Sequence, residues 1–170
     1  MSLVYRTATA ADAPALAAMG RRCFTETFGP AFPPGDMALH LERKFGEAAL
    51  PAEFLDPALS IRIAEEDGAI AAYVKLAPMD LPVPHEPGAL EVKQLYVLTP
   101  WQGAGVAAAL MGWVADTARA RGAPALYLSV WELGARAIAF YRRQGFETMG
   151  TAPFQLGSRA YQDPVMRLAL

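Results

Sequence analysis

Two kinds of hydrophobic pattern alternate along this chain: short apolar runs typical of strands, and longer runs in which apolar residues recur at helical spacing. The helical spacing is clear from Leu16 to Phe24 and again from Met37 to Phe45. Strands mixed with helices in this way predict an α/β fold. We expect strands at residues 5–9, 60–64, 69–77, 90–98, 126–130, 146–149 and 165–170, and helices at residues 12–24, 36–45, 106–121 and 134–144.

Residues between these segments indicate where they begin and end. Thr9, with Asp12 three residues later, resembles a capping box, and Asp36 is placed to cap the second helix. Residues 66–68, Glu-Asp-Gly, predict a hairpin turn between the second and third strands. The proline-rich residues 78–88 predict an exposed loop before the fourth strand.

Length and composition narrow the class of protein. With 170 residues the chain is long enough for one domain with a core and too short for two ordinary ones, so we expect a single domain over residues 1–170. Hydrophobic residues make up 54%, which excludes a disordered chain, and no apolar run reaches the roughly 18 residues of a membrane span. A net charge of −2 argues against a nucleic-acid surface. The single cysteine fits a reducing compartment, and Asp12 and Pro14 interrupt the Ala-rich start, so we expect a cytoplasmic protein.

The stretch Gln102-Gly103-Ala104-Gly105-Val106-Ala107 lies between the fourth strand and the third helix. The first N–H groups of a helix have no partner within it, and the positive end of the helix dipole adds to them. Because this turn has few Cβ atoms, a phosphate can approach the backbone itself. We therefore expect residues 102–107 to form an anion cradle; the alternative is a tight strand-to-helix connection without a ligand.

A second segment makes this pattern more specific. The motif Gln-x-x-Gly-x-Ala at residues 102–107 is followed by a strand, a helix carrying Ala137-Ile138-Ala139-Phe140-Tyr141, and Gly145-Phe146. In this order and spacing the chain resembles the GNAT superfamily of acyl-coenzyme A-dependent N-acetyltransferases. The resemblance covers most of the chain and is strongest over residues 90–146, while residues 5–9 and 166–168 resemble the family's first and last strands.

The resemblance implies a fold and an activity. The fold is a mixed, mostly antiparallel twisted sheet with splayed parallel strands four and five, flanked by four helices. The activity is transfer of an acetyl group from acetyl-CoA to a primary amine, by direct attack in a ternary complex. Residues 24–29 resemble GNAT members of the polyamine-acetylating type, so we expect a small polyamine-like acceptor first and a protein amino group second. We expect no metal, nucleic acid or membrane to take part, and a homodimer is one of the oligomeric states left open.

Two other classes of protein remain as alternatives. A non-catalytic acyl-CoA-binding sensor or interaction module would keep the fold and the cradle, but Tyr141 argues against it. A dinucleotide-dependent oxidoreductase needs its glycine-rich turn after the first strand, whereas here the turn follows the fourth.

Amine acetylation needs a base, because an alkylamine with a pKa of about 10 is an ammonium at neutral pH and has no lone pair for attack. Some members of the family have a glutamate base at the place of Glu91. By strand alternation Glu91 shares one face with Lys93, Leu95 and Val97. We expect Glu91 to be the base; the alternatives are a solvated charge beside Lys93 and a water chain to another carboxylate.

The thiolate that leaves needs a proton, and Tyr141 is the expected acid. It follows Gly134 and Ala137 on one helix face, where two small residues leave a groove for the thin pantetheine arm. It also completes the family's Phe-Tyr-x-x-x-Gly-Phe element. The alternative is that Phe140 and Tyr141 form a core aromatic pair.

The resemblance also implies which residues bind the cofactor. Backbone groups of Leu95, Tyr96 and Val97 would pair with the pantetheine, and the Val97 N–H would polarise the thioester carbonyl. Most relatives have Asn in place of Gly134, so one hydrogen bond to the cofactor arm is missing here. The residues expected at acetyl-CoA are Leu95, Tyr96, Val97, Gln102, Gly103, Ala104, Gly105, Val106, Ala107, Gly134, Ala137, Phe140 and Arg143.

The remaining candidates for chemistry are weaker. Cys23 lies on an apolar helix stripe, so we expect a buried thiol and no nucleophile. His40 and His85 are far apart and belong to no ligand cluster. Residues 24–32, with their phenylalanines and Glu26, are expected near the acceptor pocket or in the core.

Overall fold

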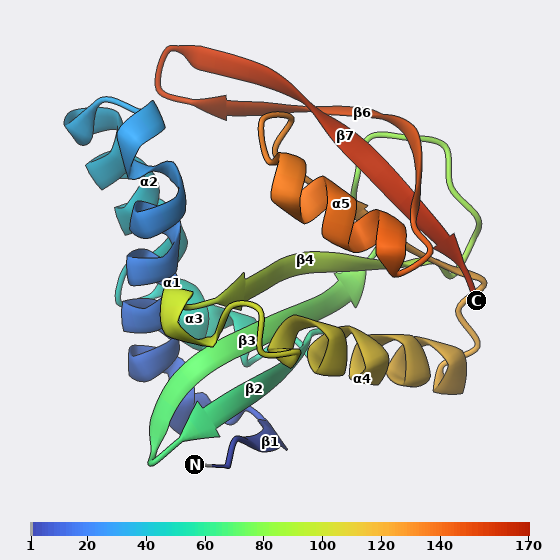
Figure 1. Cartoon of the computed structure of the whole chain (residues 1–170), viewed down its shortest axis with the longest axis horizontal. Helices are drawn as coiled ribbons and strands as arrows, with labels where there is room; N and C mark the ends of the chain where they lie inside the picture. The colour runs from blue at the N-terminus through green and yellow to red at the C-terminus, as the bar shows by residue number, and fades with distance from the viewer. Residues whose placement is uncertain (1) are drawn as a thin grey trace. The chain divides into compact units, whose positions relative to one another are not determined.

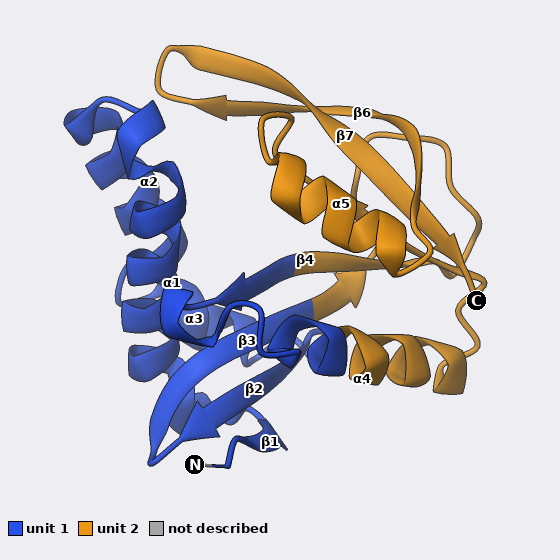
Figure 2. Cartoon of the chain, in the orientation of Figure 1, with its two compact units in different colours: residues 1–75, 94–110 blue, residues 76–93, 111–170 orange. Residues whose placement is uncertain are grey.

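The computed structural model describes residues 2–170. These residues form two compact units (Figure 2). Unit 1 contains the chain up to Lys75 together with Gln94–Leu110, and unit 2 contains Leu76–Lys93 and Met111–Leu170. The boundary falls within β3, β4 and α4, which each run from one unit into the other (Figure 2).

Apart from one short helix, strands and helices follow one another as the sequence predicts (Figure 1). The strands are β1 (Val4–Thr7), β2 (Ser60–Glu66), β3 (Ala69–Pro78), β4 (Leu90–Val97), β5 (Ala125–Ser129), β6 (Glu147–Leu156) and β7 (Arg159–Ala169). The α-helices are α1 (Ala13–Phe28), α2 (Pro34–Phe45), α3 (Ala49–Glu53), α4 (Val106–Ala120) and α5 (Ala135–Arg143). Short 3-10 helices lie at η1 (Ala10–Asp12), η2 (Gly29–Ala31) and η3 (Thr99–Trp101).

The strands form a seven-stranded sheet in the order β1-β2-β3-β4-β5-β7-β6. Strand β1 pairs antiparallel with β2, and β7 pairs antiparallel with both β5 and β6. Strands β4 and β5 are parallel, with Leu90 opposite Leu126 and Glu91 opposite Tyr127. The predicted mixed, mostly antiparallel sheet with parallel fourth and fifth strands is therefore confirmed.

The four predicted helices are present as α1, α2, α4 and α5. Helix α3 was not predicted, because its five residues are too few to show a helical period. Strands β6 and β7 are longer than predicted. These two strands pair over nearly their whole length, from Glu147 opposite Arg167 to Leu156 opposite Arg159, with an irregularity between Thr148 and Gly150. Gly150 and Pro153 in β6 and Pro164 in β7 argue locally against strands, so the sequence did not predict the full length of this hairpin.

Two local signals in unit 1 have different outcomes. The capping box is confirmed: the Thr9 N–H donates to Asp12 at 2.7 Å, and Asp12 also accepts two hydrogen bonds from Arg6, at 2.8 and 2.9 Å. Asp36 does not cap α2, because the helix begins at Pro34 and Asp36 lies inside its first turn. Proline at a first helical position is preorganised for the start, and Asp36 still lies where the dipole favours a negative charge.

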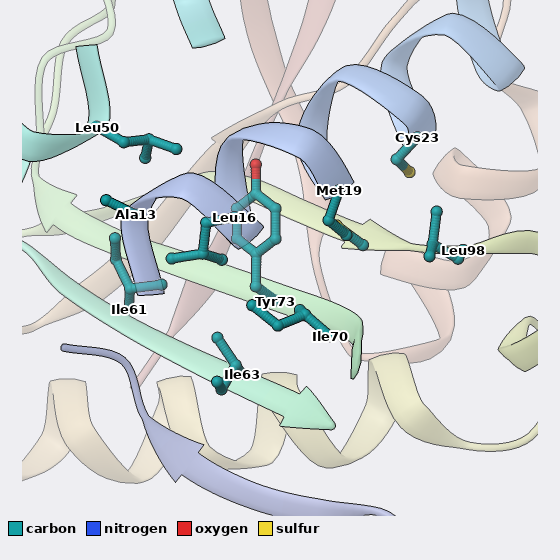
Figure 3. Close-up of a cluster of buried hydrophobic side chains, with 10 residues drawn as sticks. All are labelled: Ala13, Leu16, Met19, Cys23, Leu50, Ile61, Ile63, Ile70, Tyr73 and Leu98. Carbon is teal, nitrogen blue, oxygen red and sulfur yellow. The ribbon is translucent and has the colours of Figure 1, made fainter. Parts of the chain in front are cut away.

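The core of unit 1 lies between α1 and the strands (Figure 3). Leu16 and Met19 of α1 stand beside the ring of Tyr73, which rises from β3 (Figure 3). The Tyr73 hydroxyl donates to Gln94 Oε1 at 2.8 Å, so this buried phenol has a partner on β4. The hairpin between β2 and β3 turns at Asp67 and Gly68, both with positive φ, as predicted.

In unit 2, residues 79–89 cover one face of the sheet, and we call them the strap. Met79, Leu81 and Val83 pack against a buried cluster that contains Ala125, Tyr127, Ala152 and Val165. The predicted loop is therefore in the right place, but it is exposed on one side only. Every second residue from Met79 to Val83 packs on the sheet. The proline-rich composition of this segment does not predict that pattern.

Candidate functional site

The turn that connects η3 to α4 has the backbone of a cradle. Gly103 and Gly105 have φ values of +84° and +80°, which L side chains rarely adopt. A Cβ atom added at either glycine would meet nothing within 4 Å. The glycines are therefore needed for the shape of the turn, and the space beside them is open.

Helix α4 begins at the end of this turn with unpaired donors. The Ala109 N–H donates to the Gly105 carbonyl at 3.0 Å. The N–H groups of Val106, Ala107 and Ala108 precede this bond, so helix geometry leaves them without an intrahelical acceptor. Val106 is buried and fixes the helix start, whereas residues 102–105 are exposed. An anion fits this arrangement, because the donors and the positive end of the helix dipole lie beside an open glycine turn.

Gln102 holds the turn against the end of β4, because its Nε2 donates to the Val97 carbonyl at 3.0 Å. The structure thus brings Gln102 together with Val97, two of the residues predicted to bind the cofactor. Leu95 and Val97 are half-buried on the strand, and the Tyr96 ring packs 5.3 Å from Tyr73 in the core of unit 1.

A carboxylate of α1 also contacts the segment before the cradle. Glu26 accepts hydrogen bonds from Arg22 at 2.8 Å and from the Thr99 hydroxyl at 3.0 Å. The Arg22 hydrogen bond, with a smaller effect of Thr99, holds the pKa of Glu26 below its ordinary value. Glu26 is therefore an anion on the surface of unit 1, tied to η3.

Cys23 and His40 do not have the properties of catalytic groups. Burial raises the pKa of the Cys23 thiol to about 11, so little of the reactive thiolate exists at neutral pH. Burial, followed by the charges of Arg43 and Lys44, lowers the pKa of His40 to about 4. His40 stacks on Phe24 with ring centroids 4.7 Å apart, as a neutral part of the packing between α1 and α2.

Glu91 lies in unit 2 and is only 5% exposed, so it is not the solvated surface charge of the alternative interpretation. Its Oε2 accepts a hydrogen bond from the Asp80 N–H at 3.0 Å and lies 3.2 Å from Lys93 Nζ. Lys93 Nζ is also 3.5 Å from an oxygen of Asp80. Both contacts fix the position of the Glu91 carboxylate.

Tyr141 lies on α5 within unit 2, between two other aromatic rings. Its ring centroid is 5.2 Å from that of Phe140 and 5.8 Å from that of Phe146. Burial raises the pKa of the Tyr141 phenol above its ordinary value of 10, so the hydroxyl keeps its proton at neutral pH. Around it, Ala137 and Arg143 are exposed and Phe140 is half-buried.

Gly134 caps the start of α5 and is closely packed. Its N–H donates to the Trp131 carbonyl at 2.8 Å, and a Cβ at position 134 would lie 3.0 Å from that same oxygen. The residue before the helix therefore cannot carry a side chain unless the carbonyl moves. This contact gives a local reason for glycine at position 134.

The connection that leads to α5 is also held from β7. Asp163 is buried and accepts a hydrogen bond from the Glu132 N–H at 3.0 Å. Burial raises the pKa of Asp163 above its ordinary value of 3.8. Sequence reasoning missed Asp163, because it lies in a strand that was predicted too short.

The predicted residues thus fall into two groups, each with its own surroundings. Unit 1 holds residues 95–97 and 102–107, linked by the Gln102–Val97 hydrogen bond. Unit 2 holds Glu91 against the strap and Tyr141 among its aromatic neighbours. The sequence did not predict Asp80 as a partner of Glu91, because nothing in a proline-rich segment shows which backbone N–H will reach the strand.

Within residues 2–170, no group of three or more His, Cys, Asp or Glu side chains is arranged to hold a metal ion. None of the helices described is long and apolar enough to cross a membrane.

The sequence is similar to those of known acetyltransferases. Residues 19–146 match the family model described as the acetyltransferase (GNAT) family. An uncharacterized N-acetyltransferase of Mycobacterium bovis is 35% identical over 155 residues, which cover 91% of this chain and 96% of the relative. An uncharacterized N-acetyltransferase of Lactobacillus delbrueckii subsp. lactis is 30% identical over 160 residues, covering 94% of this chain and 92% of the relative.

A solved structure is similar over the full length. The PaiA N-acetyltransferase from Thermoplasma acidophilum, crystallised in complex with coenzyme A, matches with a TM-score of 0.83, covering 100% of both chains. The sequence identity is 16%, so this likeness concerns the fold.

Proposed function

The chain belongs to the GNAT family of acetyltransferases, and on that premise we propose that it transfers an acetyl group from acetyl-CoA to a primary amine by direct attack in a ternary complex. The observation that carries the proposal is the open glycine turn at the start of α4. Gly103 and Gly105 take positive φ, and the N–H groups of residues 106–108 precede the first helical hydrogen bond. Such a helix start is a binding site for the phosphates of a nucleotide cofactor.

In this proposal, backbone groups of residues 102–107 would hold the pyrophosphate, and the backbone of residues 95–97 would pair with the pantetheine arm. Gly134, Ala137, Phe140 and Arg143 of the α5 region would contact the pantetheine arm. When bound, acetyl-CoA supplies an acetyl group activated as a thioester.

Glu91 acts as the base that prepares the amine. Its Oε2 accepts a hydrogen bond from the Asp80 N–H and lies beside Lys93 Nζ. An ionised carboxylate can accept the proton of an ammonium directly or through one water. The free amine then has the lone pair that attack requires.

Tyr141 acts as the acid that completes the transfer. Its raised pKa means that the phenol enters the reaction protonated. The proton goes to the sulfur of the departing coenzyme A, which prevents the thiolate from attacking the new amide. Neither step needs an acyl-enzyme, which agrees with the inert state of Cys23.

The acceptor in this proposal is a small polyamine-like amine, with a protein amino group as the second choice. The net charge of −2 and the anionic Glu26 on unit 1 favour a cationic acceptor. We further propose that residues 1–170 act as one N-acetyltransferase domain in the cytoplasm, since the family match includes residues of both units.

A panel assay tests the proposal. The protein is incubated with acetyl-CoA and one amine at a time, from polyamines to peptides with a free amino terminus, and released thiol is measured. We expect thiol release that depends on the amine, is saturable, and is matched by acetylated amine in mass spectrometry. If acetyl-CoA binds but no amine in the panel causes thiol release, the proposal is overturned in favour of a non-catalytic acyl-CoA-binding protein.

A further inference from the structure

The strap is fixed to unit 2 at more than one point. Its apolar residues Met79, Leu81 and Val83 pack on the sheet, and a Cβ at Gly150 of β6 would lie 3.6 Å from Val83. The Met79 N–H donates to the Ala89 carbonyl at 3.3 Å, which brings the two ends of the strap together. This segment is a packed cover of the sheet, although it contains neither helix nor strand.

One end of the strap is held by a charged contact that the proposed chemistry does not use. The Glu86 carboxylate accepts hydrogen bonds from the Tyr127 hydroxyl and from both Nε and Nη2 of Arg167, with the Nε bond at 2.9 Å. The Arg167 hydrogen bonds, followed by that of Tyr127, hold the pKa of Glu86 at about 2. Glu86 is therefore an anion at any pH where the enzyme works, and we call these three residues the clamp.

The other end of the strap touches Glu91. The Asp80 N–H donates to Glu91 Oε2 at 3.0 Å, and Lys93 Nζ lies between the two carboxylates, 3.2 Å from Glu91 and 3.5 Å from Asp80. The Asp80 side chain itself is 86% exposed, so its backbone rather than its carboxylate is the fixed contact. The position of Glu91 thus depends on where the strap places one N–H group.

The clamp and Glu91 lie on one face of the sheet. Glu91 of β4 is opposite Tyr127 of β5, and Tyr127 is opposite Arg167 of β7. Paired residues of neighbouring strands project to the same side, so these three side chains form a row beneath the strap. Lys93 on the same strand and Asp80 on the strap are charged residues in contact with Glu91. Tyr127 lies opposite Glu91 on β5, and its hydroxyl donates to Glu86.

We infer that Glu86, gripped by Tyr127 and Arg167, is a positioning residue that holds the strap down and, through the Asp80 N–H, keeps Glu91 aligned for removing a proton from the acceptor amine. This inference rests on the proposed function of Glu91 as the base. Three contacts on one carboxylate restrict a segment that has no ladder of backbone hydrogen bonds of its own. Without these three contacts the strap keeps its apolar packing on the sheet, but the position of the Asp80 N–H relative to Glu91 is no longer fixed.

The kinetic test is a double-mutant cycle. Glu86→Gln keeps the shape of the side chain and removes its charge, and Glu91→Gln removes the base. We expect Glu86→Gln to lower kcat roughly tenfold, because small misplacements of a reacting group are costly, with the KM for acetyl-CoA unchanged. In the Glu91→Gln background, Glu86→Gln should have no further effect on kcat, since it acts through Glu91.

Matched variants separate positioning from general damage. Glu42→Gln in α2 removes another glutamate–arginine contact, the 2.7 Å pair with Arg21, and should leave kcat unchanged. Arg167→Lys keeps the charge but loses part of the grip, so its kcat should lie between those of wild type and Glu86→Gln. If the effects of Glu86→Gln and Glu91→Gln on kcat simply multiply, Glu86 has a merely structural role and the inference is wrong.

A second measurement does not depend on catalysis. Hydrogen exchange of the Asp80 amide, followed by NMR, should be faster in Glu86→Gln than in wild type, and unchanged in Glu42→Gln. Unchanged Asp80 exchange in Glu86→Gln would overturn the inference even if the enzyme is active. Suppose instead that Asp80 exchange is faster in Glu86→Gln but Glu91→Gln retains full turnover. The clamp then positions the strap, and the assignment of Glu91 as the base is wrong.

Discussion

Three substitutions of Gly105 test whether the cradle binds a pyrophosphate. Together they separate the effects of backbone strain, side-chain bulk and negative charge. Gly105 has a φ of +80°, and a Cβ there would have no neighbour within 4 Å. Gly105→Ala therefore introduces backbone strain without a clash, at a cost of about 1–2 kcal/mol in stability for a residue held in the left-handed region. Gly105→Gln adds bulk above the turn, and Gly105→Glu adds the same bulk with a negative charge.

The comparison of Glu with Gln isolates electrostatics. Two unit charges about 4 Å apart repel by about 1 kcal/mol in water and by about 4 kcal/mol at an effective dielectric constant of about 20. A pyrophosphate in the cradle should therefore bind Gly105→Glu between roughly fivefold and several hundredfold more weakly than Gly105→Gln. At higher salt this difference should shrink, because the turn is exposed and its charges are screened.

Titration calorimetry with coenzyme A measures these affinities directly, and thermal unfolding of each variant checks that the fold is intact. We expect the order wild type, Gly105→Ala, Gly105→Gln, Gly105→Glu from tightest to weakest. Equal affinities for Gly105→Gln and Gly105→Glu would refute the placement of the pyrophosphate at this helix start.

Three further predictions follow from named contacts. Tyr141→Phe keeps the ring and removes the acid, so turnover should fall by about 10²–10⁴ in steady-state assays while calorimetry finds the coenzyme A affinity nearly unchanged; unchanged turnover when chemistry limits the rate would reject the role. Glu91→Gln should lower turnover with a high-pKa amine and remove or shift the ascending limb of the pH–rate profile, whereas a profile that stays the same would exclude Glu91 as the base. The Arg6 hydrogen bonds hold the pKa of Asp12 well below its ordinary value of 3.8, so their contribution to stability is present above about pH 4 and is lost as the pH falls further. Asp12→Asn should accordingly reduce the free energy of unfolding by about 1–3 kcal/mol at pH 7 and by less at pH 3 in urea titrations; an equal loss at both pH values would contradict this origin.

Local sequence signals predicted most of the fold because several of them agree at each element. The helix start at Thr9 and Asp12 and the hairpin at Asp67 and Gly68 depend on residues close together in the chain, and both are confirmed. The errors occur where tertiary contacts decide. Helix α3 is too short to show a period, and the β6–β7 hairpin includes Pro153 and Pro164, which argue locally against strands.

The candidate site divides in the same way. The positive φ of Gly103 and Gly105 could be expected from glycine in a strand-to-helix turn. The burial of Glu91 could not be expected, because the strap that contacts it through the Asp80 N–H has no periodic hydrophobic pattern in the sequence. In the clamp, Tyr127 lies 41 residues after Glu86 in the sequence and Arg167 lies 81 residues after it. No short sequence spacing therefore indicates this contact.

Direct attack by an amine on acetyl-CoA can be checked by a single turnover with enzyme in excess over acetyl-CoA. With an accepted amine present, acetylated amine and free thiol should appear together in equal amounts, and intact-protein mass spectrometry should find no acetyl group on the chain at any time. Without the amine, we expect no thiol release beyond slow hydrolysis. Thiol release without amine, accompanied by a protein that gains one acetyl group and then passes it to the amine, would show an acyl-enzyme and rule out direct attack.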